Sequence, residues 1–317
     1  MGLYRINFRL LFIALVFIIS FWILFLNQKS SLSSVISYTS IGEVIRKPII
    51  ASASTVAPIE TKSANLKKNR KSKSKSKKKK KTTLKSKSNK ENMVYPGIRV
   101  PAKAAHTATV IFLHGLGDSP AGWVFFAQEA ARQGRLKHVK FVFAEAPNQP
   151  VTLNYGMVMP AWYDIKALNN VMGQQDEEGI FASIDRLKQV INEEIQDGLP
   201  SNRIVIGGFS QGCAISLGTS VVYDKPLGGV IGLSGYLPIH EKIAAQKSDA
   251  NIDTPYFLGH GTADQVVKFS SGQMSRDFLK NTLHRSKLEW HQYEGMLHTA
   301  SPEEIEEVFK FLEKSIP

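Results

Sequence analysis

The sequence predicts an α/β fold, with a mostly parallel central sheet and helices on both faces. From about residue 93 onward, short runs of mainly apolar residues alternate with longer segments of helical pattern, as expected for a parallel sheet covered on both sides. A capped start predicts a final helix, because Ser301 can act as N-cap, Pro302 follows it and Glu304 completes a capping box. The expected strands cover 108–113, 140–144, 203–208, 229–233, 255–259 and 287–291, and the other expected helices cover 123–132, 176–196, 211–222 and 270–283.

The charge of the 317-residue chain is unevenly distributed. Residues 1–90 carry 20 Lys and Arg against two acidic residues, whereas residues 91–317 carry 20 Lys and Arg against 25 Asp and Glu. The formal net charge of +13 therefore originates in residues 1–90, and residues 91–317 carry a small excess of acidic residues. Cys213 is the single cysteine, which excludes a framework of intrachain disulfides.

Residues 1–28 contain an uncharged run of 17 residues, Leu10 to Leu26, preceded by Arg5 and Arg9. This length reaches the lower limit for a membrane-crossing helix and exceeds the apolar stretch of most signal peptides. We therefore expect an uncleaved single-span membrane anchor, with a cleaved signal peptide as the alternative. The two arginines favour a cytoplasmic N-terminus. The absence of any N-x-[ST] sequon favours a cytosolic catalytic domain instead, so both sides of the membrane stay open.

Residues 29–92 are predicted to form a disordered linker. Ser, Thr and Ala dominate its first half, and the segment 62–90 is rich in lysine, with too little apolar surface to offset the entropy of ordering. The lysine-rich run is expected to be a solvated tether that anionic lipid headgroups can attract, or a nuclear-import signal. A cytoplasmic and nuclear location is thus the alternative to the membrane. Nucleic acid is not an expected partner, because no aromatic residues interleave the lysines.

A G-x-S-x-G pattern, Gly208 to Gly212, lies between a predicted strand and a predicted helix. Such a turn exposes a serine hydroxyl at the end of a sheet, and its strained backbone leaves no room for side chains at the flanking positions. The pattern alone is weak evidence, but its place between strand and helix predicts Ser210 as the nucleophile of an α/β-hydrolase fold.

A serine nucleophile needs a base and an acid, which follow it in this order: serine, acid, histidine. His298 lies in a loop between the last strand and the final helix, and Asp264 follows the strand 255–259 through a short turn. We therefore predict His298 as general base and Asp264 as the residue that orients it. The rivals His291 and His284 lie in a strand and near the end of a helix, whereas Asp253 precedes its strand and Asp277 is in mid-helix.

The glycine-rich segment 114–118 ends the first strong strand. It can supply one backbone N–H to an oxyanion hole, and the N–H of Gln211 can supply the second. The alternative is an ordinary turn between strand and helix. Cys213 is expected to be a small buried apolar residue without a catalytic role.

Six segments together resemble the acyl-protein thioesterase / lysophospholipase family of α/β-hydrolases. They occur in the order found in that family, and the resemblance covers roughly residues 93–317, the expected catalytic domain. The segments are FLHGLGDSPAGW (112–123), APNQPVTLNYGMVMPAWYDI (146–165), GGFSQGCAISLG (207–218), GLSGYLP (232–238), GHGTADQVV (259–267) and YEGMLHTASPEE (293–304).

This resemblance implies specific roles. Ser210, Asp264 and His298 would form the triad, Leu116 and Gln211 would be the oxyanion donors, and the stretch around Trp162 would line an acyl-binding groove. The family removes fatty acyl groups from protein cysteines or lysophospholipids, without a metal ion or cofactor. We therefore expect a serine hydrolase that cleaves long-chain acyl thioesters of S-acylated proteins. The alternatives are a carboxylesterase or lysophospholipase of broad specificity, and a catalytically inactive binding protein with a hydrolase fold.

Overall fold

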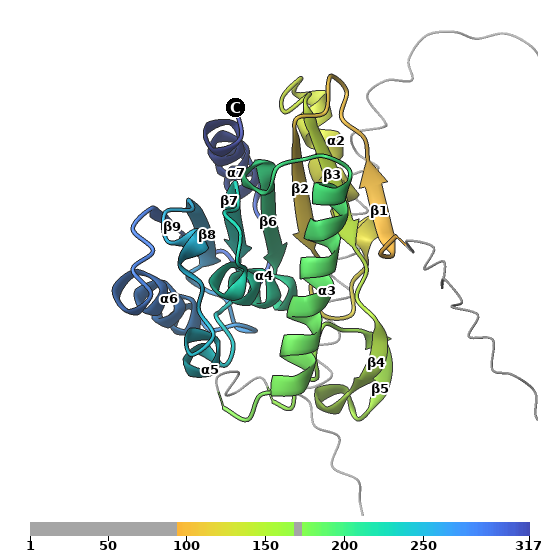
Figure 1. The fold of residues 1–317 in the computed structure, drawn as a ribbon. Helices are drawn as coiled ribbons and strands as arrows, with labels where there is room; N and C mark the ends of the chain where they lie inside the picture. Colours follow the sequence, from red (N-terminus) through yellow and green to blue (C-terminus); the bar gives the residue numbers. More distant parts are fainter. Residues whose placement is uncertain (1–93, 168–172) are drawn as a thin grey trace, which may run out of the picture. The chain divides into compact units, whose positions relative to one another are not determined.

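The computed structural model describes residues 94–167 and 173–317. Within these residues the central sheet has seven strands in the order β1-β3-β2-β6-β7-β8-β9 (Figure 1). Only β1 runs antiparallel to its neighbour, and all other pairs are parallel. The strands are β1 (Gly97–Val100), β2 (Ala108–Leu113), β3 (Val139–Ala144), β6 (Ile204–Phe209), β7 (Gly229–Leu233), β8 (Tyr256–Gly261) and β9 (Leu288–Tyr293).

Helices cover both faces of this sheet, which confirms the predicted fold class. One apolar core lies between the sheet and α3, α4 and α5, and the other lies between the sheet and α2 and α7. Alternate residues of one strand face the two cores: Ile111 and Leu113 of β2 face the first, and Val110 and Phe112 face the second. The helices are α2 (Val124–Arg132), α3 (Glu177–Gln196), α4 (Gln211–Val222), α5 (His240–Ala244), α6 (Phe269–Asp277) and α7 (Pro302–Ser315).

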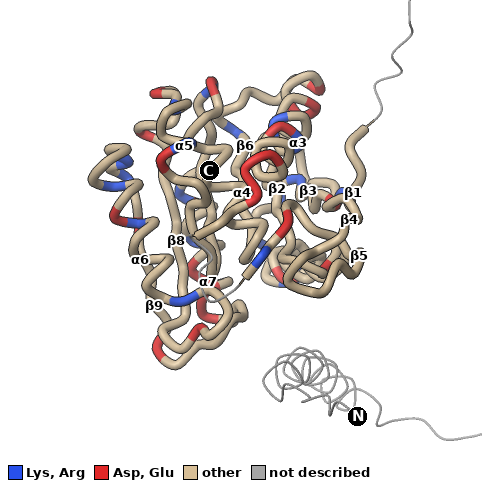
Figure 2. The backbone as a smooth tube through the Cα atoms, turned by 90° about the horizontal axis from the view of Figure 1, so that it is seen from below, with Lys and Arg blue, Asp and Glu red and all other residues tan. Residues whose placement is uncertain are grey.

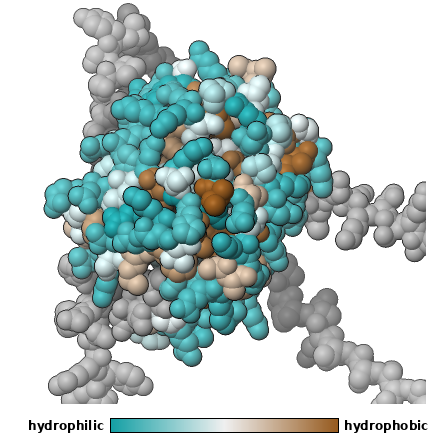
Figure 3. Space-filling model, turned by 60° about the vertical axis from the view of Figure 1, so that its left-hand side comes forward, coloured by the Kyte–Doolittle hydropathy of each residue, from teal (hydrophilic) through white to brown (hydrophobic). Residues whose placement is uncertain are grey.

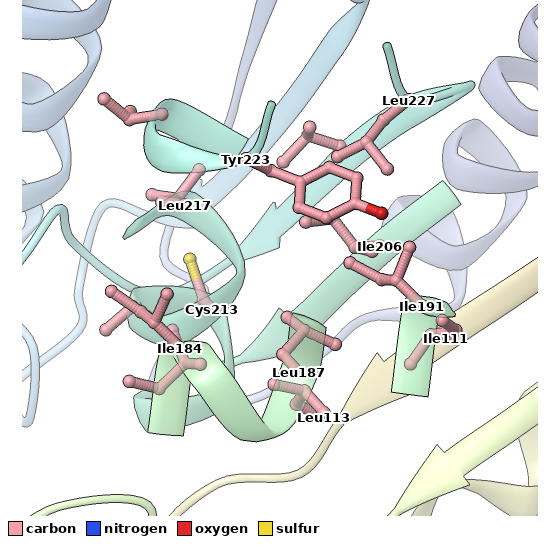
Figure 4. Close-up of a cluster of buried hydrophobic side chains, with 14 of the residues drawn as sticks. Ile111, Leu113, Ile184, Leu187, Ile191, Ile206, Cys213, Leu217, Tyr223 and Leu227 are labelled. Carbon is pink, nitrogen blue, oxygen red and sulfur yellow. The ribbon is translucent and has the colours of Figure 1, made fainter. Parts of the chain in front are cut away.

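Helix α4 is the most deeply buried of the described helices. Every residue from Gln211 to Val221 is buried, because the helix lies on the sheet and also contacts α3 and α5. Figure 4 shows part of this packing, with Cys213 and Leu217 of α4 among the aliphatic side chains of α3 and the strands. The helix that begins directly after Ser210 is therefore held firmly in place.

Several elements differ from the sequence-based expectation. The strand β1, the hairpin of β4 (Asn148–Val151) and β5 (Met157–Pro160), and the short helix α5 are not predicted. In the region expected to be one helix over 270–283, the α-helix α6 ends at Asp277, and a π-helical turn, Phe278–Thr282, follows it. Short 3-10 turns occupy Pro120–Trp123, Thr152–Asn154, Ser201–Arg203 and Asp249–Asn251.

Only half of the predicted capping box forms at the start of α7. The hydroxyl of Ser301 accepts the backbone N–H of Glu304 at 3.1 Å. The carboxyl group of Glu304 turns inward instead of back to Ser301, and it is buried without a hydrogen-bond partner within the described part of the chain. Burial, followed by the charge of Glu307, raises the pKa of Glu304 to about 8.

Charged residues of both signs are interspersed along the described backbone (Figure 2). Arg135 illustrates the pattern, since it pairs with Glu306 at 2.8 Å and with Glu313 at 2.6 Å. The excess of basic residues thus belongs to the N-terminal segment, as the sequence indicates. That segment, including the predicted linker 29–92, lies outside the described residues.

The predicted membrane anchor needs correction. Across residues 94–167 and 173–317, no helix combines the length and the apolar character that a bilayer span requires. The longest, α3, has 20 residues but many charged side chains, and the apolar α4 has only 12 residues. The run Leu10 to Leu26 itself lies outside the described residues. The structure thus supplies no span to support the predicted location.

Two adjacent phenylalanines of α2 allow a matched test of the packing. Phe126 is 1% exposed and its ring stacks on Phe309 at 5.1 Å, whereas Phe125 is 41% exposed. We predict that Phe126→Ala lowers the free energy of unfolding in urea by about 3–5 kcal/mol, because it leaves a cavity. Phe125→Ala is the control and should cost less than about 1.5 kcal/mol. Equal losses for the two variants would contradict this description of the second core.

Candidate active site

Ser210 lies on a sharp turn between β6 and α4. Its backbone has φ +54° and ψ −116°, a conformation that non-glycine residues rarely adopt. The flanking glycines permit this turn by close approach. A Cβ atom on Gly208 would lie 2.4 Å from the carbonyl carbon of Gly212, and one on Gly212 would lie 2.2 Å from the carbonyl oxygen of Leu113. Both glycines of the G-x-S-x-G pattern are therefore required by packing.

His298 and Asp264 approach Ser210 from loops that follow β9 and β8. The Nδ1 atom of His298 lies 2.7 Å from Oδ2 of Asp264, and its Nε2 atom lies 2.9 Å from Oγ of Ser210. Because an ionised carboxylate only accepts hydrogen bonds, Nδ1 carries the proton. Nε2 is then free to accept the hydroxyl proton of Ser210, so this arrangement can activate the serine as a nucleophile.

Asp264 is buried and nevertheless ionised. Its Oδ1 atom accepts the backbone N–H groups of Val266 and Val267 at 2.8 and 2.9 Å. Burial raises the pKa of Asp264, but contacts with His260 and His298, the charge of His298 and the N–H of Val266 outweigh it and lower the pKa to about 2. The carboxylate is therefore charged at neutral pH and can stabilise an imidazolium on His298.

The glycine-rich loop after β2 lies beside the turn at Ser210. An ideal Cβ on Gly115 would lie 3.4 Å from Cβ of Ser210. The N–H of Gly117 is already bonded to the carbonyl of Pro160 at 2.8 Å. Within the described residues no hydrogen bond involves the N–H of Leu116 or of Gln211. The N–H of Leu116 in the loop and the N–H of Gln211 at the start of α4 are thus available to bind an oxyanion.

The structure shows which side chains hold this loop, which the sequence analysis did not foresee. Buried His114 accepts the N–H of Ala146 at Nε2, so Nδ1 carries the proton and donates to the carbonyl of Gly115 at 2.8 Å. Burial lowers the pKa of His114, which favours this neutral form. The indole N–H of Trp162 donates to the carbonyl of His114 at 2.9 Å. The position of His114, as the first residue of the glycine-rich segment 114–118, was the available signal.

Gln211 links the nucleophile turn to the segment around Trp162. Its side-chain oxygen accepts the backbone N–H of Trp162 at 2.7 Å, and its side-chain N–H donates to the carbonyl of Tyr163 at 2.7 Å. Trp162 is only 1% exposed, so its ring is buried beneath the glycine-rich loop that it contacts at His114. The groove-lining role that the resemblance implies for this stretch remains a prediction.

Three other residues, Cys213, His291 and His284, were expected from the sequence to have no catalytic role. Cys213 is buried, and burial raises the pKa of its thiol. His291 stacks on Phe257 at 4.3 Å and contacts Glu307, away from the site, and His284 is exposed. The two rival histidines thus lie apart from Ser210.

Gly212 provides a test of the turn. We predict that Gly212→Ala abolishes most activity and lowers the free energy of unfolding by about 1–3 kcal/mol or more, because the added methyl group overlaps the carbonyl of Leu113. Urea unfolding and esterase assays measure both effects. The control is Gly218→Ala in the same helix, where the methyl group would meet only the side-chain ends of Ile184 and Ile243, at 3.0 and 3.1 Å. A Gly212→Ala variant as stable and active as wild type would refute this account of the turn.

Several known proteins are similar to this chain in sequence. The Phospholipase/Carboxylesterase family, an α/β-hydrolase family, matches residues 96–316. A protein of Yarrowia lipolytica named acyl-protein thioesterase 1 is 59% identical over 222 residues, which are 70% of this chain and 98% of the relative. A protein of the same name from Mycosarcoma maydis is 48% identical, over 67% of this chain and 92% of the relative.

The solved structures agree. The crystal structure of Zea mays acyl-protein thioesterase 2 has a TM-score of 0.61 and 30% sequence identity, and it covers 70% of this chain and 100% of its own. The Yarrowia lipolytica and Zea mays relatives are matched over 98% and 100% of their own length, and the matched part that the structure describes contains no helix that could cross a membrane. The prediction of a membrane-anchored location is thereby corrected. The resemblance seen in the sequence is confirmed, and the chain belongs to the Phospholipase/Carboxylesterase family of α/β-hydrolases.

Proposed function

We propose that this chain is a serine hydrolase that cleaves long-chain acyl thioesters of S-acylated protein cysteines, with residues 93–317 as its catalytic domain. The observation that carries the proposal is the continuous contact from Ser210 through His298 to Asp264. Relatives at 59% and 48% identity are named acyl-protein thioesterase 1, which supports the thioester as substrate.

The reaction proceeds in two halves. Oγ of Ser210 attacks the thioester carbonyl carbon while its proton moves to Nε2 of His298. The resulting oxyanion is bound by the backbone N–H groups of Leu116 and Gln211. The C–S bond then breaks, and the departing cysteine sulfur takes the proton from His298. In the second half a water molecule, deprotonated by His298, attacks the acyl-serine ester, and the fatty acid leaves as Ser210 regains its proton.

The hairpin beside the oxyanion loop supports a fatty acyl substrate. Met157 and Val158 of β5 are 63% and 64% exposed, although both are apolar. Sδ of Met159 would lie 3.7 Å from a Cβ on Gly117, so β5 adjoins the proposed oxyanion hole. Together with the stretch around Trp162, these side chains are proposed to bind the acyl chain. Figure 3 illustrates how apolar residues of the described domain occur among hydrophilic ones on one face.

The family description favours one second candidate. Its members are described as phospholipases and carboxylesterases, and the same acyl-enzyme chemistry would hydrolyse oxygen esters. A carboxylesterase or lysophospholipase of broad specificity is therefore the alternative. An inactive binding protein is disfavoured, because it would not require a strained serine, a paired histidine and two free N–H donors together.

Replacing the proposed nucleophile tests this mechanism. We predict that Ser210→Ala lowers kcat for thioester and ester substrates by about 10⁴-fold or more. His298→Ala should cause a similar loss, and the double variant should be hardly worse, because the two residues act as one unit. His284→Ala, at an exposed histidine, is the control and should keep wild-type kcat. Additive losses in the double variant would show that His298 does not act as the base for Ser210.

Acyl chain length tests the substrate class. An apolar groove gains about 0.8 kcal/mol for each buried CH₂. We therefore predict that kcat/KM rises by up to about a hundredfold over four added methylenes, less the cost of ordering the chain. Measurement of acetyl to decanoyl thioesters of one thiol gives the series. Equal kcat/KM for all of them would favour a carboxylesterase of small substrates.

A further inference from the structure

A second histidine contacts the carboxylate of Asp264. His260 belongs to β8 and is 1% exposed. Its Nε2 atom lies 2.9 Å from the carbonyl oxygen of Val267 and 3.4 Å from Oδ2 of Asp264. A carbonyl only accepts, so Nε2 carries the proton and donates it to Val267, while Nε2 lies close to the same carboxylate oxygen that His298 contacts.

The ring of His260 is fixed by its surroundings. Phe269 packs against it edge-on at 5.9 Å, and Trp290 lies on another side at 6.2 Å. Gly272 of α6 also packs closely against the ring, since a Cβ atom at this position would lie 2.4 Å from Nδ1 of His260. The ring thus has little room to move, and its N–H group is held in one direction.

The same N–H group contacts the loop that carries Asp264, at the carbonyl of Val267. Oδ1 of Asp264 accepts the N–H groups of Val266 and Val267, and the carbonyl of Val267 faces His260. Oδ1 is therefore held from within the loop. Oδ2 has only the two histidines as polar contacts within the described residues, and of these His298 is the proposed base. The hydrogen bond from His260 to the carbonyl of Val267 fixes this loop from the side of β8, next to Oδ2.

We propose that His260 is a positioning residue: its Nε2–H donates to the carbonyl of Val267 and thereby holds the loop of Asp264, so that Oδ2 of Asp264 stays where it accepts the N–H at Nδ1 of His298. The inference rests on the proposed function, because it assigns His260 a role in orienting the base. His260 exchanges no proton in the reaction. Its hydrogen bond to Val267 fixes the loop whose N–H groups hold Oδ1 of Asp264, so that His298 keeps Nε2 directed at Ser210.

The test compares replacements with and without the donor. His260→Leu has a similar volume and no donor, whereas His260→Gln can place an amide N–H near the position of Nε2. The control is His291→Leu in the adjacent strand, where the histidine pairs with Gly259 and does not contact Asp264. Exhaustive labelling with a fluorophosphonate counts the folded sites, so that kcat is expressed per active site. If His260→Leu does not fold, His260→Asn replaces it, because its shorter amide cannot reach the carbonyl of Val267.

We expect His260→Leu to lower kcat about 10- to 100-fold with little change in KM, the size of loss known for partners that orient metal-ligating histidines. His260→Gln should recover most of kcat, and His291→Leu should match wild type. The NMR resonance of the His298 Nδ1 proton should move upfield or broaden in His260→Leu and return in His260→Gln.

Two results would overturn the inference. Equal loss in the Leu and Gln variants would show that only packing of the ring matters, and wild-type kcat in His260→Leu would show that the contact has no role. Failure of the proposed function is distinguishable, because it would appear as retained activity in Ser210→Ala whatever the effect at His260.

Discussion

The conformation of Ser210 is the constraint on which the candidate site depends. A non-glycine residue at φ +54° costs on the order of 1–3 kcal/mol, and it persists only where the surrounding structure enforces it. Here β6 is fixed between β2 and β7, and every residue of α4 from Gln211 to Val221 is buried. The burial of both elements offsets the strain. The same turn directs the hydroxyl of Ser210 toward His298 and leaves the N–H of Gln211 at the start of a helix, where negative charge is stabilised.

The charge of Asp264 depends on the balance between its burial, which raises its pKa, and its hydrogen bonds, which lower it. Burial alone would favour a neutral carboxyl group, which could not stabilise a protonated His298. Donors around the carboxylate reverse this preference: two backbone N–H groups contact one oxygen, and two histidines contact the other. The charge is thereby kept in a site from which water is largely excluded, where its effect on the imidazole is strong.

The sequence was sufficient to predict the fold class and the strands that precede the candidate site residues. Ser210, Asp264 and His298 could be proposed because each follows a recognisable strand, and parallel strands present their carboxyl ends at one edge of a sheet. The β4–β5 hairpin was missed, because Asn148–Val151 contains a proline and lacks an alternating pattern. The inward turn of Glu304 and the end of α6 at Asp277 depend on tertiary packing, which local patterns do not record. His260 and His114 were likewise missed, since their roles depend on contacts across loops.

The central claim is that hydrolysis passes through an acyl group on Ser210. It is tested most directly by mixing the protein with a long-chain acyl thioester, quenching in acid within one turnover and mapping the acylated peptide by mass spectrometry. The account predicts one acyl group per chain on Ser210 that forms and decays at rates compatible with kcat, and none in His298→Ala on that time scale. An acyl group on another residue, or turnover without any acylated protein, would contradict it.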